Sequence, residues 1–306
     1  MSRNILRRAY LLSLAIPFLS ASAQSTKPET RSLLGDSLYP QQDTTEAIAR
    51  ADSALARHPR DIDTLIAAGA ARANLWHYND AIALYTRGLK IAPRDARLYR
   101  HRGHRYISLR RFKDAIRDLE RGRKLDPMSY DIAYHLGLAH YMASNYKTAA
   151  VEFGRCFALA KNERALAMDT ALRRGFKSCT TIATDDDDKI GMAEWYYRSL
   201  IRAGQKDNAA ALLAEITDGM RVRGSSAYYQ NLLVSKGLRS EDMVLDSLKS
   251  NELQLATASY GLAVRHLVAG DTVRARSMFE TVAKIGYWPA FGIIGSEVEL
   301  ARLKGR

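Results

Sequence analysis

Residues 62–93 read IDTLIAAGAARANLWHYNDAIALYTRGLKIAP, and residues 96–127 read ARLYRHRGHRYISLRRFKDAIRDLERGRKLDP. Aligned at a spacing of 34 residues, the two stretches place Gly69 above Gly103, and both end in proline. A fixed period of this length is typical of helical hairpins that stack in a row and bury their apolar faces against one another. These stretches therefore predict a helical solenoid.

Four columns of residues keep this phase from about Pro28 to Lys161. The columns are a glycine (Gly35, Gly69, Gly103, Gly137), an alanine (Ala47, Ala81, Ala115, Ala149), a small residue (Ala54, Gly88, Gly122, Cys156) and, in three units, a proline (Pro59, Pro93, Pro127). Small residues let neighbouring helices approach closely. Proline ends a helix because it lacks an N–H and clashes with the preceding turn. Bulky residues such as Tyr85, Leu119 and Phe153 are expected to fill the space beside the small ones.

The columns resemble the tetratricopeptide repeat, whose pattern is W-x2-L-G-x2-Y…A-x3-F…P. The third unit carries Tyr99, Arg102, Gly103 and Tyr106, then Ala115, Leu119 and Pro127. Tryptophan never stands at its position in the pattern, and Lys161 replaces the last proline. The resemblance implies an all-α, right-handed superhelical solenoid of antiparallel helical hairpins. It places four repeats over residues 24–161 and continuing degenerate hairpins over residues 162–306.

In the first unit we expect a helix over about Glu29–Tyr39, a break at Pro40 and a second helix over about Thr44–Arg57. After Lys161 the phase blurs, and Asn162–Lys177 is expected to form one helix. The following acidic run, Asp185 to Asp188, lacks the spacing of a calcium loop. Aspartates favour helix N-termini, so we expect this run to be a linker that caps the next helix.

Weaker hairpins are expected around turns at Gly204 and Gly270, with a helix pair broken at Gly237 between them. A last helix is expected over about Pro289–Lys304, because proline suits the first turn of a helix. Its polar side is expected to stay exposed and to close the solenoid as a cap.

The chain has 306 residues, a hydrophobic content of 47% and a formal net charge of +13. This length and composition suffice for a sizeable core, and helix-forming residues dominate. Removing the first 23 residues, which hold three arginines and no acid, leaves a charge of +10 (13 minus 3). The basic residues are dispersed rather than in one run, which favours an ordinary solvated surface over a dedicated anion site.

Residues 1–23, MSRNILRRAYLLSLAIPFLSASA, combine a basic start, a short apolar stretch and an A-x-A pattern that ends at Ala23. These features are typical of a secretory signal peptide. We expect cleavage after Ala23 and a periplasmic or secreted mature protein without a membrane span. A single N-terminal membrane anchor is the alternative.

Two cysteines are present, Cys156 and Cys179. Export permits disulfides. Cys156 occupies the small-residue column, so packing alone explains it. Cys179 lies at the end of the next expected helix, a position that permits a bridge without requiring one. Packing and a disulfide both stay open at this point.

By the repeat resemblance, the first helix of each hairpin lines a concave groove. The groove-facing positions are Arg97, Arg100, His101 and His104 in the third unit and Tyr134, His135 and Tyr141 in the fourth. Arginine, histidine and tyrosine suit an acidic or aromatic peptide segment. The alternative is that these arginines bind no partner and simply extend into water. The carboxylate clamp of chaperone-binding relatives is not reproduced, because Ile66 and Ala70 stand where its first pair of residues belongs.

No catalytic residue, metal site or cofactor is predicted. His101, His104 and His135 fall on neighbouring helices, but no carboxylate or H-E-x-x-H motif joins them. Gly35 to Leu38 spell GDSL, the motif of a serine hydrolase group, but neither the expected context nor a downstream D-x-x-H accompanies Ser37.

The leading hypothesis is therefore a non-catalytic scaffold that binds a protein or peptide partner, including acidic segments, in its concave groove. The alternative is a module that binds acidic envelope polymers through its net positive charge. Nucleic acid is the least favoured of these anions because of the export signal.

Overall fold

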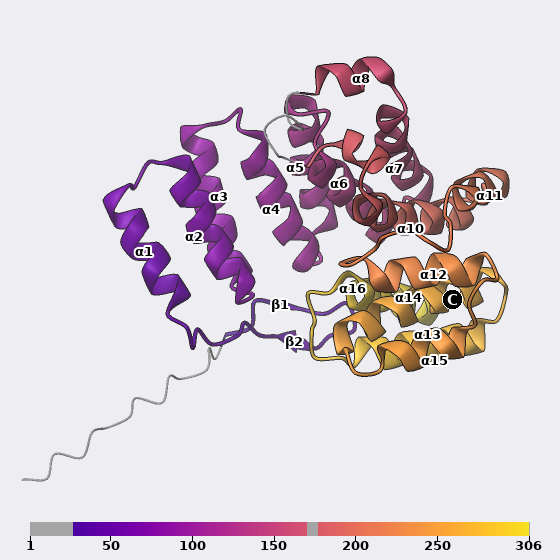
Figure 1. The fold of residues 1–306 in the computed structure, drawn as a ribbon. Coiled ribbons are helices and arrows are strands. Elements are labelled where there is room, and N and C mark those ends of the chain that lie inside the picture. The colour runs from indigo at the N-terminus through magenta and orange to yellow at the C-terminus, as the bar shows by residue number, and fades with distance from the viewer. Residues whose placement is uncertain (1–26, 170–176, 306) are drawn as a thin grey trace, which may run out of the picture.

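The computed structural model describes residues 27–169 and 177–305, so the predicted signal peptide over residues 1–23 lies outside the described residues. Helical hairpins stack along the chain, which confirms the all-α solenoid class (Figure 1). The repeat region contains α1 (Ala47–Arg57), α2 (Ile62–Asn74), α3 (Tyr78–Ile91), α4 (Ala96–Ser108), α5 (Phe112–Leu125), α6 (Tyr130–Met142) and α7 (Tyr146–Ala160).

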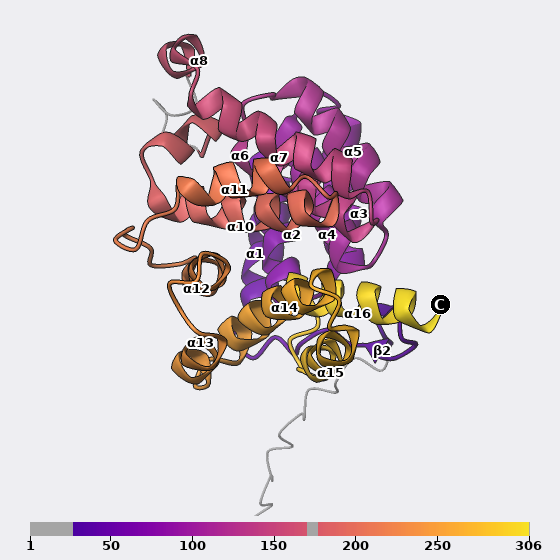
Figure 2. The same cartoon turned by 90° about the vertical axis from the view of Figure 1, so that its right-hand side faces the viewer.

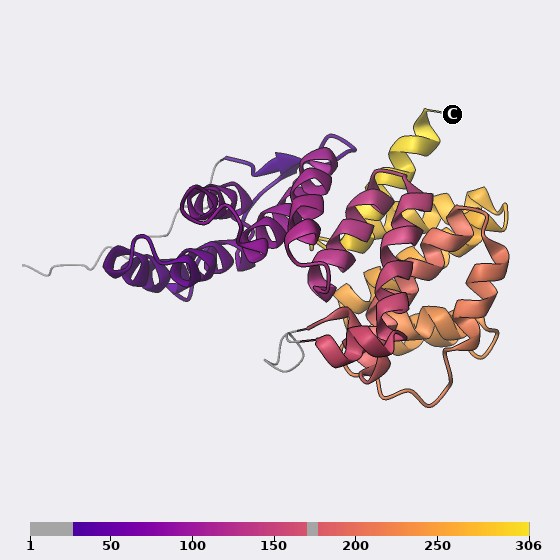
Figure 3. The ribbon, with the colours of Figure 1, turned by 90° about the horizontal axis from the view of Figure 1, so that it is seen from above.

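A second group of elements follows, which we call the C-terminal group. It comprises α8 (Glu163–Met168), the 3-10 helix η1 (Cys179–Ala183), α10 (Asp186–Arg202), α11 (Lys206–Ala214), α12 (Ser226–Ser235), α13 (Glu241–Leu248), α14 (Glu252–Val268), α15 (Thr272–Ala283) and α16 (Phe291–Lys304). Viewed from above, the first helices project as an arm while this group gathers at the other end (Figure 3). Figure 2 shows α14, α15 and α16 lying beneath the stacked repeats.

The glycine column lies where each helix pair packs most closely. A Cβ added at Gly69 would lie 2.4 Å from Cε1 of Tyr85, and one at Gly137 would lie 2.5 Å from Cε1 of Phe153. At Gly103 the nearest atom would be Cγ of Leu119, at 2.6 Å. The bulky residue sixteen positions later thus occupies the volume that a side chain would need, which is the physical reason for the column.

Helix starts and hairpin turns repeat with the same period. Asp61, Asp95 and Ser129 cap α2, α4 and α6, each accepting a hydrogen bond from a backbone N–H of the first turn. Between the two helices of a hairpin, Trp76 and Arg110 have φ values of 65° and 62°. A left-handed backbone costs a non-glycine residue about 1–2 kcal/mol. The surrounding contacts must therefore stabilise these turns.

The later hairpins have their turns at the three glycines where the sequence analysis predicted a turn or a break. Their turns contain Gly204, Gly237 and Gly270, all with positive φ, so the left-handed turn carries no side chain there. Asp185 caps α10 by accepting from the N–H of Asp188, as expected for the acidic run. Of the single helix expected over Asn162–Lys177, the described part contains only α8.

The first unit departs from the prediction. The expected helix over Glu29–Tyr39 is wrong, because this segment forms β1 (Thr30–Arg31) and β2 (Ser37–Leu38), which pair antiparallel. Gly35 has a φ of +105° in the turn, and Ser32 Oγ accepts hydrogen bonds from the N–H groups of Leu34 and Asp36. This turn replaces the helical hydrogen bonds that the repeat pattern implied.

We call residues 29–44 the strap, since this segment crosses from the repeats to the C-terminal group (Figure 1). Glu29 accepts a hydrogen bond from the backbone N–H of Asn79 (2.8 Å), at the start of α3. At the other end, the N–H of Leu33 donates to Oε2 of Glu297 in α16 (3.0 Å). The strap therefore connects two regions that are far apart in sequence.

The C-terminal helix also differs from the prediction. It is not a terminal cap with an exposed polar side, because α16 packs against α14 and α15 and reaches α6. Glu297 and Glu299 are 3% and 2% exposed. Glu297 pairs with Arg110, and Glu299 pairs with Arg202 (2.7 Å). These partners allow two carboxylates to be buried, which the helical pattern alone did not reveal.

The two cysteines form a disulfide that joins α7 to η1. Both residues are fully buried, so Cys156 fills the small-residue column as well as making the bridge.

We predict that removing this disulfide destabilises the protein. The bridge closes a loop between residues 23 positions apart, and the loss of that constraint on the unfolded chain costs about 3 kcal/mol. Urea unfolding of the oxidised protein, the reduced protein and a Cys156→Ala, Cys179→Ala variant measures the effect. Two titratable thiols in the native protein, or equal unfolding midpoints, would contradict the assignment.

We also predict that Gly137→Ala lowers the free energy of unfolding by about 1–3 kcal/mol, because the added methyl overlaps Phe153. Gly219→Ala is the matched control, since nothing lies within 4 Å of a Cβ at that position. Equal urea midpoints for the two variants would show that the glycine column does not limit helix packing.

Candidate binding face between the two halves

The predicted arginines lie on the inner face of α4, where each is paired with an acid of a neighbouring hairpin. Arg97 reaches Asp63 of α2 (2.6 Å) as well as Asp95 (2.7 Å). Arg100 reaches Asp131 of α6 (3.2 Å). The net positive charge of this face is therefore smaller than the two arginines alone would give. The ion pairs also link adjacent repeats.

The predicted histidines are covered by the chain itself. The rings of His104 and His135 lie 4.1 Å apart between centroids, and the ring of Phe291 at the start of α16 lies 5.5 Å from His104. Burial lowers the pKa of both histidines well below the usual value. Burial and nearby Arg100 lower the pKa of His101 to about 4. All three imidazoles are neutral at pH 7.

No group of three metal-binding side chains converges anywhere in the part of the chain that the structure describes. Instead, Nδ1 of His135 lies 2.6 Å from the carbonyl oxygen of Asp131, and Phe291 packs beside the ring. The histidine pair is thus a packing contact between the repeats and the C-terminal group.

The two predicted tyrosines have different environments. Tyr134 is half-buried, and its hydroxyl lies 3.4 Å from that of Tyr228 in α12. Tyr141 is 1% exposed and packs on Tyr146 and Trp195, with centroid distances of 5.2 and 5.3 Å. The expectation that Tyr141 lines an open groove is corrected, because the C-terminal group covers this end of the inner face.

What remains open is a cavity of about 590 Å³ between α2, α4 and the C-terminal group, which we call the inner cavity. Tyr78 and Arg105 line it from the repeats, and Tyr287 and Phe291 line it from the opposite side. A second cavity of about 480 Å³ contains Tyr134 and His135. Both cavities share Gly224, Ser225 and Tyr228 in their linings, so they are neighbours along the same face.

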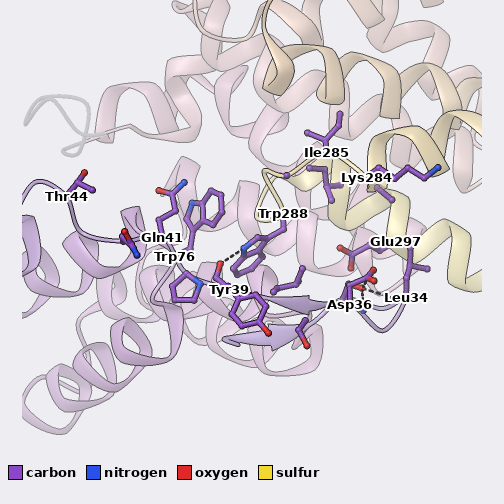
Figure 4. Close-up of a pocket in the computed structure, with 18 residues that line it drawn as sticks. Leu34, Asp36, Tyr39, Gln41, Thr44, Trp76, Lys284, Ile285, Trp288 and Glu297 are labelled. Atoms are coloured by element: carbon purple, nitrogen blue, oxygen red, sulfur yellow. Dashed lines mark hydrogen bonds between the residues drawn. The ribbon is translucent and has the colours of Figure 1, made fainter. Parts of the chain in front are cut away.

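A third and larger cavity, of about 890 Å³, lies beside the strap (Figure 4). Trp76 and Trp288 stand on one side of it, and Asp36 and Glu297 stand on the other. Ser37 of the GDSL sequence belongs to its lining, but that lining includes no histidine to act as a base. The cavity therefore lacks the arrangement that a serine nucleophile needs.

Sequence reasoning missed the aromatic contact that joins the two halves. The ring of Trp288 lies 5.7 Å from Trp76 and 5.3 Å from Tyr78, and its Nε1 donates to the carbonyl oxygen of Tyr39 (2.9 Å). The sequence did contain one periodic sign of these positions. Trp76 and Arg110 are 34 residues apart, at the same place in successive hairpins, and both stand in left-handed turns. Nothing in the sequence indicated that both side chains meet the segment before α16.

Comparisons with known proteins agree with this architecture. Residues 100–156 match the model of the tetratricopeptide repeat family. No protein of curated function matches the sequence. Over residues 100–156 the chain is similar to this family, and the stacked hairpins with their 34-residue columns have the same helical-hairpin architecture.

Several solved structures match the chain in part. YrrB, described as a TPR protein with an unusual peptide-binding site, is 15% identical, with a TM-score of 0.42 over 78% of this chain and 93% of YrrB. A tetratricopeptide repeat protein from Parabacteroides merdae is 14% identical, with a TM-score of 0.42 over 85% of this chain and 93% of that protein. MamA is 16% identical, with a TM-score of 0.40 over 62% of this chain and 86% of MamA.

Within the described residues, no helix combines the length and apolar character that crossing a membrane requires.

We predict that Glu297→Gln destabilises the protein by about 3–5 kcal/mol, because Arg110 is left buried without its carboxylate. The strap should also loosen, since Leu33 loses a charged acceptor. Urea unfolding measures the first effect, and the rate of tryptic cleavage at Arg31 measures the second.

Asp246→Asn is the control for this variant. It removes a carboxylate that pairs with Lys249 at the surface, where both side chains are more than 70% exposed, and it should change stability by less than about 1 kcal/mol. If Glu297→Gln behaves like Asp246→Asn, the buried pair does not hold the two halves together.

Proposed function

We propose that this protein is a non-catalytic scaffold that binds a peptide or protein partner on the inner face of α2, α4 and α6. The observation that carries the proposal is the pair of neighbouring cavities on that face, between the repeats and the C-terminal group. Stacked helical hairpins present such a face as a continuous surface, and peptide binding uses surfaces of this kind.

We further propose that the mature protein acts outside the cytoplasm, after cleavage behind Ala23. The pattern of residues 1–23 supports this location, and so does the Cys156–Cys179 disulfide. Structural disulfides persist in oxidising compartments and are rare where thiols are kept reduced.

The alternative is the binding of acidic envelope polymers through the net positive charge. The pairing of Arg97 and Arg100 with aspartates argues for a selective face rather than a general anion site. The two functions differ in their response to salt, because unspecific binding of a polyanion weakens steeply as salt rises.

Capture of partners from the organism's envelope extract tests the proposal. The mature chain from Gln24 is compared with an Arg97→Ala, Arg100→Ala, His101→Ala variant at low and moderate salt. We expect the wild type to retain one discrete partner at both salt concentrations and the variant to lose it. The partner, once purified, should bind the variant at least tenfold more weakly by calorimetry.

An Arg117→Ala, Lys161→Ala, Lys249→Ala variant is the control, because these basic side chains are 63–72% exposed and lie away from the inner face. Equal loss of the partner in both variants would point to net charge and would favour the polyanion function. A partner that both variants retain would contradict a role for Arg97, Arg100 and His101, which belong to neither cavity lining.

A further inference from the structure

Arg105 differs from most of the buried or half-buried arginines that the structure describes. Arg102 pairs with Asp118 (2.6 Å), Arg202 pairs with Glu299 (2.7 Å), and Arg110 pairs with Glu297. Among the described residues, no carboxylate pairs with Arg105; its guanidinium lies over the ring of Tyr78, 4.9 Å from the centroid. Arg105 is half-buried, and a partly desolvated guanidinium without a counter-ion can accept an anion that reaches it.

The surroundings of Arg105 make it the sole charge in the inner cavity. The residues that line this cavity include no acid, and the one other basic side chain, His104, is kept neutral because burial lowers its pKa well below the usual value. Burial lowers the pKa of the Arg105 guanidinium, and the nearby charge of Arg100 acts in the same direction. The guanidinium stays protonated at neutral pH, because arginine has a pKa above 12 in water. An anion that enters the cavity would meet attraction and no repelling carboxylate.

The rest of the lining is aromatic. Trp76, Tyr78, Tyr287 and Phe291 all contribute to the cavity. Trp76 and Tyr287 pack edge to face, 5.2 Å apart between centroids. Such walls favour a flat apolar group, while a guanidinium binds a carboxylate with two parallel hydrogen bonds. The two requirements are met together by a group that carries a ring and a carboxylate close to each other.

We propose that the inner cavity binds the C-terminal residue of a peptide that ends in an aromatic amino acid, with its carboxylate on Arg105 and its ring among Trp76, Tyr78 and Phe291. This inference rests on the proposed function and names the part of the partner that the face recognises. The adjoining cavity, which shares Ser225 and Tyr228 with the first, leaves room for the preceding residues of the peptide.

A defined probe tests the inference without the natural partner. The probe is the acetylated peptide Gly-Ser-Gly-Ser-Gly-Phe with a free carboxyl end, compared with the same peptide as its C-terminal amide. Binding to the mature wild-type protein is measured by calorimetry and by the fluorescence of the tryptophans. We expect the amide to bind about tenfold to a hundredfold more weakly, because it loses a charge-assisted hydrogen bond.

Arg105→Gln should weaken binding of the free peptide by a similar factor and abolish the difference between acid and amide. Arg105→Lys keeps the charge and should retain part of that difference. Arg111→Gln is the matched control: Arg111 stacks on Tyr106 outside the cavity and pairs with Asp114, so its loss should leave the affinity unchanged. Circular dichroism of each variant verifies folding.

The outcomes separate this inference from the proposed function. Equal binding of acid and amide, or no binding of either, overturns the role of Arg105 even if envelope capture still yields a partner at α4. If acetyl-phenylalanine alone binds as tightly as the six-residue peptide, the peptide assignment is overturned in favour of a small aromatic carboxylate. Failure of envelope capture with preserved discrimination of the two peptides would instead contradict the partner function and leave the cavity assignment standing.

Discussion

The buried ion pair between Arg110 and Glu297 is the contact on which the closed form of this protein depends. Arg110 comes from the left-handed turn of the third hairpin, and Glu297 comes from the last helix. Both side chains are 3% exposed. Glu297 also accepts the N–H of Leu33, and Arg110 donates to the carbonyl oxygen of Trp288 (3.1 Å). One carboxylate thus joins the repeats, the strap and the C-terminal group.

This closure changes what the concave face can do. In an open solenoid the inner helices face solvent along their whole length. Here Phe291 covers His104 and His135, and the C-terminal group buries Tyr141. Binding is thereby restricted to the cavities that remain, and their walls come from both halves. A site of this kind is more enclosed than a groove, and it combines repeat residues with residues that follow no repeat.

The repeat itself rests on steric complementarity. Gly69, Gly103 and Gly137 each leave space for the large side chain of the next helix. Asp61, Asp95 and Ser129 start the helices at the same interval. Both features are local and periodic, so a single sequence suffices to predict them. The strap shows the limit of this reasoning: Gly35 fits the glycine column by position, yet it serves a left-handed β-turn.

The sequence by itself determined the hairpins, their order and the glycine turns at Gly204, Gly237 and Gly270, because these depend on contacts between residues close in the chain. It also placed Arg97, Arg100 and His101 on one helix. Only the tertiary structure decided that Cys156 and Cys179 form a bridge and that Asp63 and Asp131 pair with the arginines. It also decided that Arg105 has no carboxylate partner among the residues that the structure describes. The physical reason is distance along the chain: Arg110 and Glu297 are 187 residues apart, and no periodic pattern encodes which buried charges meet.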